Sequence, residues 1–398
     1  MSRDGRPSPN EWPRTATIAT VAGAVLCVVG LIVAPRRTAA AYLVAYVAVL
    51  AVVLGVLAMI MIARLTAATW FVALRRQAEQ VTATLPALAV MFVPVLFAAR
   101  WLYPWASRVE DPNLRAAIEA KSAYLNLPFF IIRGIVYWAI WIGVGETLRR
   151  ASLAQDHGDS PRVAHRLRVV SAVGIVAFAL SVTFAAFDWM MSLSPSWYST
   201  VYGVNYFAGA MVGGLGLIAV LTERGRRSGE LPEAVGADHL HALAKLLLTF
   251  VLFWAYIGFS QFIVIWSAEI PVESTWYVVR TRGGWSTLGI AILAGHFVVP
   301  LLALLLLAVK RRPALIAALG AWLLAMHYLD CYWNVMPDAS SRAPSTMLGP
   351  LWDFGALLLV CGVVTLTWSV RRAGEPAIPQ GDPRLVPSLE YSTRNALG

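Results

Sequence analysis

Ionisable side chains lie inside long apolar segments of this sequence, where a charge is costly and usually marks a pathway, a site or an ion pair. Those toward the membrane side opposite the termini, called the outer side below, are Arg133, Asp188, His296, His327, Asp330 and Asp353. A helix rise of about 1.5 Å per residue places them in the outer half of the predicted spans or near the middle. Imidazoles and carboxylates can exchange protons, so these residues are candidates for a pathway, a binding site or an ion pair inside the bundle.

His327 and Asp330 stand three residues apart in "MHYLDCYW" and share one face of the predicted helix. The carboxylate can orient the imidazole or share a proton with it. The alternative is a histidine whose ring is satisfied in a helix interface. Hydroxyl, amide and aromatic side chains able to carry hydrogen bonds or ordered water lie between the two membrane surfaces: Tyr137, Thr183, Tyr202, Tyr206, Thr249, Tyr256, Ser260 and Gln261.

Asp188 ends an apolar run and precedes a turn, in "AAFDWMMSLSPSWYST", residues 185–200. Two interpretations remain open. The carboxylate faces the bundle and exchanges protons, or it caps the following turn by accepting backbone hydrogen bonds.

On the inner side, Glu146 ends the fourth predicted span, while His239, His241 and Lys245 open the seventh. These two ends together could form an inner proton entry. They could equally anchor the helices at the lipid headgroups, with Lys245 extending its ammonium to the surface.

His296 and His327 come from adjacent antiparallel spans at comparable depths, so a haem with two axial histidines is geometrically conceivable. A two-haem cytochrome b needs four such histidines on two helices, and the other four of the six histidines here lie in or beside loops. Cys27, Cys331 and Cys361 are isolated, so we expect no metal site, iron–sulfur cluster or covalent haem in this chain.

The composition indicates that the chain is a membrane protein. Of 398 residues, 59% are hydrophobic and 14% are charged, whereas about a quarter of a soluble domain is charged. About ten segments are long enough to span a bilayer, and all should be helices. They cover roughly 16–34, 40–63, 82–103, 125–147, 167–190, 199–222, 240–267, 285–309, 313–336 and 347–370. We predict one all-α membrane domain over 16–370, an N-terminal segment over 1–15, and a C-terminal tail over 371–398 that lies on a partner or is disordered.

The net charge of +10 comes from short clusters of Lys and Arg between the apolar segments. Twenty-one of these residues lie on the side of the termini and eight lie in the opposite loops, which predicts cytoplasmic termini and makes nucleic-acid binding improbable. Two connecting stretches look ordered, 69–81 and 107–125, the second with a helix start at Asp111 and Pro112. The alternative for both is a solvated connector.

Two blocks of the sequence carry a resemblance. "FDWMMSLSPSWYSTVYGVNYFAGAM" is similar to the ActF-type membrane subunit of alternative complex III, the bacterial quinol:cytochrome c oxidoreductase. "AKLLLTFVLFWAYIGFSQFIVIWSAEIPVESTWYVVRTRGGW", followed by "GHFVVPLLALL", resembles the same subunit, so the similar blocks cover roughly residues 180–310.

The resemblance implies a fold related to the NrfD and polysulfide-reductase membrane subunits, with spans 2–5 and 6–9 forming two four-helix bundles flanked by spans 1 and 10. It implies the bacterial inner membrane and these partners: a homologous quinol-binding membrane subunit, a periplasmic iron–sulfur protein, multihaem cytochromes c and lipids. Haem c and iron–sulfur clusters would belong to the partners, and a quinone such as menaquinone is an allowed ligand.

The function that follows is a scaffold and proton-conducting subunit that is not catalytic alone. The residues expected to be associated with a proton path or a quinone are Arg133, Asp188, His296, His327, Asp330, Asp353, Glu146 and Lys245. Two rivals remain: a secondary transporter, against which the sequence shows no inverted repeat or paired broken helices, and a purely structural membrane anchor.

Overall fold

The computed structural model of the chain describes residues 11–158, 161–268, 270–340 and 348–393. Within these ranges every regular element is a helix, and ten helical segments are long and apolar enough to cross a membrane. The predicted all-α membrane fold is therefore confirmed. Uninterrupted helices form seven of the segments: α1 (Glu11–Val33), α2 (Pro35–Leu65), α8 (Leu127–Gln155), α9 (Pro161–Trp189), α10 (Tyr202–Ser228), α11 (Ala237–Ala268) and α17 (Gly349–Arg371).

The remaining three segments contain a proline or a change of helix type. The ninth is α16 (Pro313–Ser340), with Pro337 near its outer end. The eighth joins α13 (Gly284–Ile292), a π-helix (Leu293–Val298) and α14 (Val299–Leu305). The third, Thr69–Phe97, comprises η1 (Thr69–Phe71), α3 (Val72–Thr82), α4 (Leu85–Met91) and α5 (Val93–Phe97), and the short helix α6 (Ala99–Leu102) follows it.

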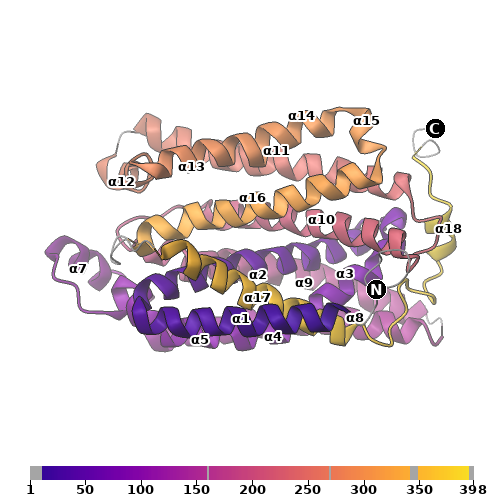
Figure 1. Cartoon of the computed structure of the whole chain (residues 1–398), viewed down its shortest axis with the longest axis horizontal. Helices are drawn as coiled ribbons and strands as arrows, with labels where there is room; N and C mark the ends of the chain where they lie inside the picture. Colours follow the sequence, from indigo (N-terminus) through magenta and orange to yellow (C-terminus); the bar gives the residue numbers. More distant parts are fainter. Residues whose placement is uncertain (1–10, 159–160, 269, 341–347, 394–398) are drawn as a thin grey trace.

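Helix α2 lies at the centre of the molecule, where it packs against α9, α10, α16 and α17 (Figure 1). One group of helices contains α2, α3 to α6, α8 and α9, and a second contains α10, α11, α13 to α14 and α16. The pair α1 and α17 flanks them. This agrees with the expected two bundles and two peripheral helices.

Glycines permit close contacts between helices, both between the two bundles and within the second bundle. A Cβ atom added at Gly55 of α2 would lie 1.9 Å from the Ala210 carbonyl oxygen of α10. One at Gly216 of α10 would lie 2.9 Å from the Gly320 carbonyl oxygen of α16. Small residues at such crossings let helix backbones approach closely. In a membrane this matters because lipid tails are as apolar as helix side chains, so helices associate through close van der Waals packing and not through a hydrophobic force.

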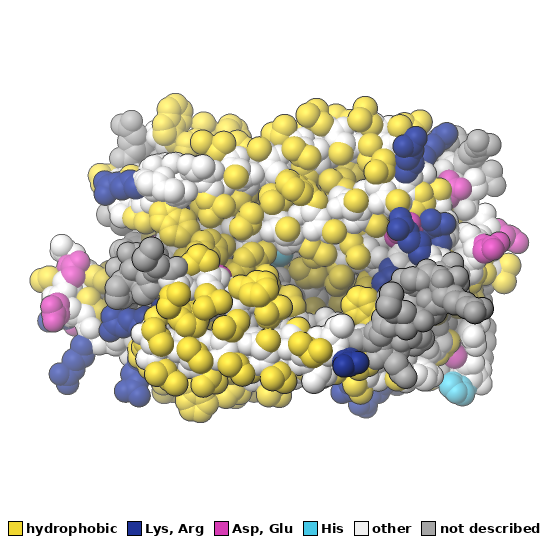
Figure 2. Space-filling model, in the orientation of Figure 1, with side chains coloured by type: hydrophobic (Ala, Val, Ile, Leu, Met, Phe, Trp, Pro, Cys, Tyr) yellow, Lys and Arg dark blue, Asp and Glu magenta, His cyan; other side chains and the backbone are white. Residues whose placement is uncertain are grey.

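Side chains are sorted along the long axis of the molecule, as a bilayer requires. Figure 2 shows hydrophobic side chains over the middle of the visible face and charged side chains mainly at its two ends. Helix α1 starts at the same end as the C-terminal residues, and α7 (Pro112–Glu119) lies at the opposite end (Figure 1). The chain is therefore a multi-pass membrane protein, and the described residues nearest to its two ends lie at the same end of the helix bundle.

The stretch 69–81 is neither a surface helix nor a solvated connector. Helix α3 is buried along its whole length, including the arginines Arg75 and Arg76, and it belongs to a third span that starts at Thr69 instead of residue 82. In the outer stretch, α7 begins as predicted, because the Asp111 side chain accepts a hydrogen bond from the Asn113 N–H. None of its residues is buried, so it is a solvated helix.

The C-terminal tail packs on its own chain, which corrects the expectation of a partner-bound or disordered segment for the described residues 372–393. Helix α18 (Leu385–Leu389) lies against α3 and η1. The Ala73 N–H donates to Ser388 Oγ over 3.1 Å, and Arg75 forms an ion pair with Asp382 at 2.6 Å. Residues 394–398 lie outside the described residues.

Candidate functional site

A stripe of polar residues follows one face of the outer half of α16. His327, Asp330, Asn334 and Asp338 are spaced three and four residues apart, so they lie above one another on the helix. The Asn334 amide donates to Asp330 Oδ1 over 3.1 Å. Arg280 of α12 (Pro271–Arg280) donates to the Asn334 carbonyl oxygen over 2.7 Å and to Asp338 Oδ2 over 2.6 Å. The stripe therefore connects the outer end of the helix with the interior.

Asp330 is the acid at the inner part of this stripe. It lies ten residues from the end of α16 at Ser340, about 15 Å by helix rise, and is 7% exposed. The Trp254 indole N–H of α11 donates to its Oδ2 over 3.2 Å. No Lys, Arg or His of the described residues forms an ion pair with it. Asp330 therefore has neutral hydrogen-bond donors and no cationic partner.

A small cavity, large enough for about one water molecule, adjoins Asp330. It is lined by Met190, Tyr202, Asn205, Tyr206, His327, Asp330, Cys331 and Asn334. Asn205 Oδ1 and His327 Nδ1 are buried and have no hydrogen-bond partner among the described residues. A buried water needs two to four polar neighbours, and this wall offers them. Tyr202 and Tyr206 belong to the hydroxyl set singled out in the sequence.

His327 and Asp330 share a helix face and a cavity, but they do not contact each other directly. Both lie against Gly209 of α10: a Cβ atom there would be 3.1 Å from His327 Nδ1 and 3.6 Å from Asp330 Oδ2. His327 Nε2 lies 3.7 Å from Cys331 Sγ. The two side chains can exchange a proton only through an intervening group such as water.

His296 lies in the π-helix of the eighth span, fully buried. Its ring meets the Trp254 ring edge to face, with centroids 4.3 Å apart, so Trp254 connects His296 with Asp330. Neither ring nitrogen has a hydrogen-bond partner in the described part of the chain. The cavity beside His327 is far too small for a porphyrin, and His296 is not in its lining. The residues around these histidines do not fit a haem.

Asp188 forms a buried ion pair between α8 and α9. Arg133 donates to both carboxylate oxygens over 2.8 Å, and the Tyr137 hydroxyl donates to Oδ2 over 2.8 Å. The Arg133 guanidinium also lies over the Tyr124 ring, 3.8 Å from its centroid. The carboxylate is directed at Arg133 and Tyr137 and not at the following turn, where Ser192 bonds the Asp188 backbone carbonyl instead.

Asp353 is likewise paired. At the outer end of α17 it accepts two hydrogen bonds from Arg37 of α2, over 2.8 and 2.5 Å. The Tyr332 hydroxyl lies 3.4 Å from Asp353 Oδ2. This contact ties a peripheral helix to the central one.

The inner residues Glu146 and Lys245 are not brought together. Glu146 pairs with Arg149 and Arg150 on its own helix, over 3.0 and 2.7 Å, whereas Lys245 is exposed. Helices α8 and α11, which carry them, lie on opposite sides of the molecule (Figure 1). A shared inner proton entry therefore has no support in this geometry.

A larger cavity of about 410 Å³ opens at the outer end, between the segment after α7 and the turn after α9. Lys121, Tyr124, Phe187, Met191, Ser192 and Tyr198 are among its lining residues. Its volume falls in the range of small-molecule sites. Tyr124 also contacts Arg133, so this cavity adjoins the Arg133–Asp188 pair.

The sequence interpretation missed Trp254, Asn205, Asn334 and the pair Arg280–Asp338. The spacing of Asn334 and Asp338 after His327 and Asp330 was the available signal, because it extends one helical stripe to the outer surface. Trp254, Asn205 and Arg280 come from three other helices, and no local pattern marks them. No known family model matches the chain, and no curated protein is significantly similar to it.

Proposed function

We propose that this chain is a membrane subunit of a quinol:cytochrome c oxidoreductase of the alternative complex III type, in which it is a scaffold and conducts protons through its second bundle. The observation that carries the proton role is Asp330, a buried acid that has no cationic partner among the described residues and borders a water-sized cavity. The resemblance of residues 187–211 and 244–285 supports the choice of complex.

The contrast among the acids supports this assignment of roles. Asp188, Asp353 and Glu146 are each paired with arginine, and protonating such a carboxylate would leave an uncompensated cation. Asp330 can gain or lose a proton while keeping its hydrogen bonds from Trp254 and Asn334. Acids inside a membrane that carry protons need this freedom.

The proposed path is a half-path that opens to the outer side. From Asp330 it runs along Asn334 toward Arg280 and Asp338, and inward it reaches His327 across the cavity. Beyond His327, the close backbone contact of Gly216 with Gly320 fills the space between α10 and α16. Protons released when a neighbouring subunit oxidises quinol would leave through this half-path, while haem c and iron–sulfur clusters in the partners carry the electrons.

The decisive experiment replaces Asp330 in the assembled complex. Asp330→Asn keeps an acceptor for Trp254 but cannot ionise, so proton release coupled to quinol oxidation should fall about tenfold or more. Asp330→Glu, which retains a titratable group, should recover part of it. The complex is isolated from native membranes, and its c-type haem absorbance verifies assembly.

Two results would count against the proposal. If the Asp330→Asn complex assembles and releases protons at the original rate, the chain is a structural anchor. If the chain purifies without any c-type haem protein and catalyses solute counterflow in liposomes, it is a transporter.

A further inference from the structure

A second cavity, of about 230 Å³, lies at the inner end of the molecule and has no part in the proposed proton path. The end of α2, the end of α8, the beginning of α9 and the C-terminal tail form its wall. Its lining residues are Arg64, Ala67, Gln155, Ala164, Leu167, Arg168, Asp382, Pro383 and Arg384. Three of them are arginines and one is an acid, so the cavity is suited to an anion.

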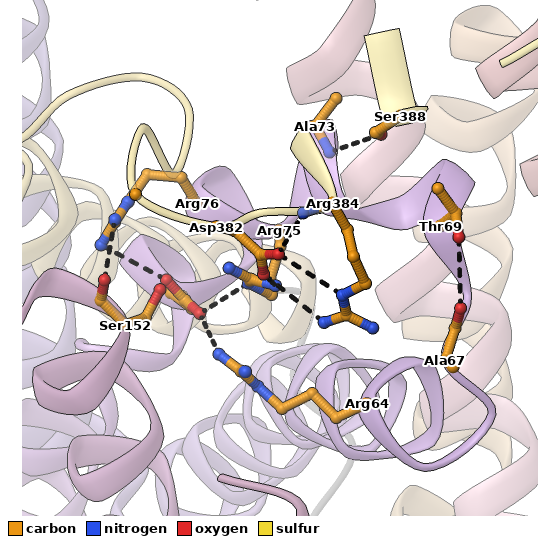
Figure 3. Close-up of polar contacts among 12 residues, drawn as sticks. Arg64, Ala67, Thr69, Ala73, Arg75, Arg76, Ser152, Asp382, Arg384 and Ser388 are labelled. Atoms are coloured by element: carbon orange, nitrogen blue, oxygen red, sulfur yellow. Dashed lines mark hydrogen bonds and ion pairs between the residues drawn. The ribbon is translucent and has the colours of Figure 1, made fainter. Parts of the chain in front are cut away.

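The acids near this cavity are already shared between arginines (Figure 3). Glu79 of α3 accepts from Arg64 over 3.0 Å and lies 3.2 Å from Arg75. Asp382 lies 2.6 Å from Arg75 and 3.4 Å from Arg384. Because each carboxylate serves more than one guanidinium, the cluster retains a positive charge that its own acids do not balance.

Two of the lining arginines have unused donor capacity. Arg64 is 5% exposed, yet its Nε–H is buried and has no hydrogen-bond partner in the described part of the chain. Arg168 is exposed and forms no ion pair with any described residue. Guanidinium groups with free donors are preferred partners of phosphate, because one guanidinium can donate two parallel hydrogen bonds to two phosphate oxygens.

An apolar, membrane-facing surface begins directly beyond Arg168 on α9. Val169, Val173, Val176 and Leu180 are 46%, 68%, 61% and 58% exposed, and their spacing of three and four residues places them on one face of the helix. In a bilayer this face contacts acyl chains. A molecule with a phosphate in the cavity could therefore lay its hydrocarbon chains along α9.

We propose that this cavity binds the phosphate of an anionic phospholipid from the leaflet on the side of the termini. Arg64, Arg168 and Arg384 surround the phosphate, and the valine surface of α9 receives the acyl chains. Basic pockets between membrane helices bind such headgroups. Since Arg384 belongs to the tail and Arg168 to α9, the bound lipid joins the tail to the membrane domain.

The test uses the full-length chain purified in detergent, with phosphatidylglycerol and phosphatidylcholine as probes in native mass spectrometry. Phosphatidylglycerol should be retained preferentially, and Arg168→Gln should weaken its binding about fivefold, the effect of one basic contact near a membrane surface. Arg166→Gln is the matched control, because Arg166 is also exposed on α9 but does not line the cavity. It should bind like the unmodified chain.

Inorganic phosphate separates the two sources of the anion. If phosphatidylglycerol raises the unfolding temperature of the chain and millimolar phosphate does not, the result supports a phospholipid as the ligand. Equal protection by phosphate would overturn the lipid in favour of a soluble phosphate ligand. Equal retention of the two lipids, or equal weakening by Arg168→Gln and Arg166→Gln, would also overturn the proposal.

Discussion

At the scale of single residues, the acids proposed from the sequence differ in their partners within the described part of the chain: some are paired with arginine, whereas Asp330 has only neutral hydrogen-bond donors. Asp188 belongs to the first kind, since Arg133 and Tyr137 satisfy its carboxylate inside the protein. Of the two sequence interpretations for this residue, the hydrogen bonds favour neither proton exchange nor a turn cap. They indicate a bridge between α8 and α9. Asp330 is of the second kind, because its partners are neutral.

This division predicts opposite effects on stability. Asp188→Asn leaves the Arg133 charge buried and unpaired, and breaking such a pair costs about 3–5 kcal/mol. The thermal unfolding midpoint of the purified chain should therefore fall clearly. Asp330→Asn, which removes no ion pair, should leave the midpoint nearly unchanged and is the matched control. Equal midpoints for the two variants would contradict the division.

At the scale of elements, the buried helix α3 and the C-terminal tail depend on each other. The charges of α3 are inside the protein because Asp382 of the tail and Asp156 after α8 pair with Arg75 and Arg76. Burial by itself raises the pKa of the Asp382 carboxyl. The charges of Arg75 and Arg384 and the hydrogen bonds that they donate lower this pKa by more than burial raises it, so that it is about 2. The carboxylate therefore stabilises the docked tail.

The sign of this pKa shift predicts how docking depends on pH. Because the pKa of Asp382 is lower in the folded state than its ordinary value of 3.8, its contribution is complete above about pH 4 and is lost as the pH falls toward 2. Cleavage of the tail by pepsin should accordingly be slow at pH 4 and fast near pH 2. Asp382→Asn should make it fast at both values, and a pH-independent rate in the unmodified chain would refute the mechanism.

At the scale of the whole molecule, the sequence predicted the helices well because lipid permits few alternatives. It did not predict the pairings. Arg37 is one of the eight basic residues expected in the outer loops, yet it donates to Asp353 in the last span. The charges of α3 suggested a surface location because their partners lie far away in the chain, at Asp156 and Asp382. The depth of a residue in the membrane can be predicted from the local sequence pattern. Which acid neutralises which arginine depends on tertiary contacts between distant parts of the chain.

The orientation of the whole molecule determines the direction of the proposed half-path. The excess of basic residues on the side of the termini predicts that this side is cytoplasmic, so the Asp330 stripe should open to the periplasm. Asn113→Cys on α7 should react with an impermeant maleimide in intact cells, and Ser228→Cys at the end of α10 only after permeabilisation. Both variants need a background without Cys361, the exposed native thiol. The reverse labelling pattern would direct the half-path to the cytoplasm, where it could take up protons but could not release those of quinol to the outside.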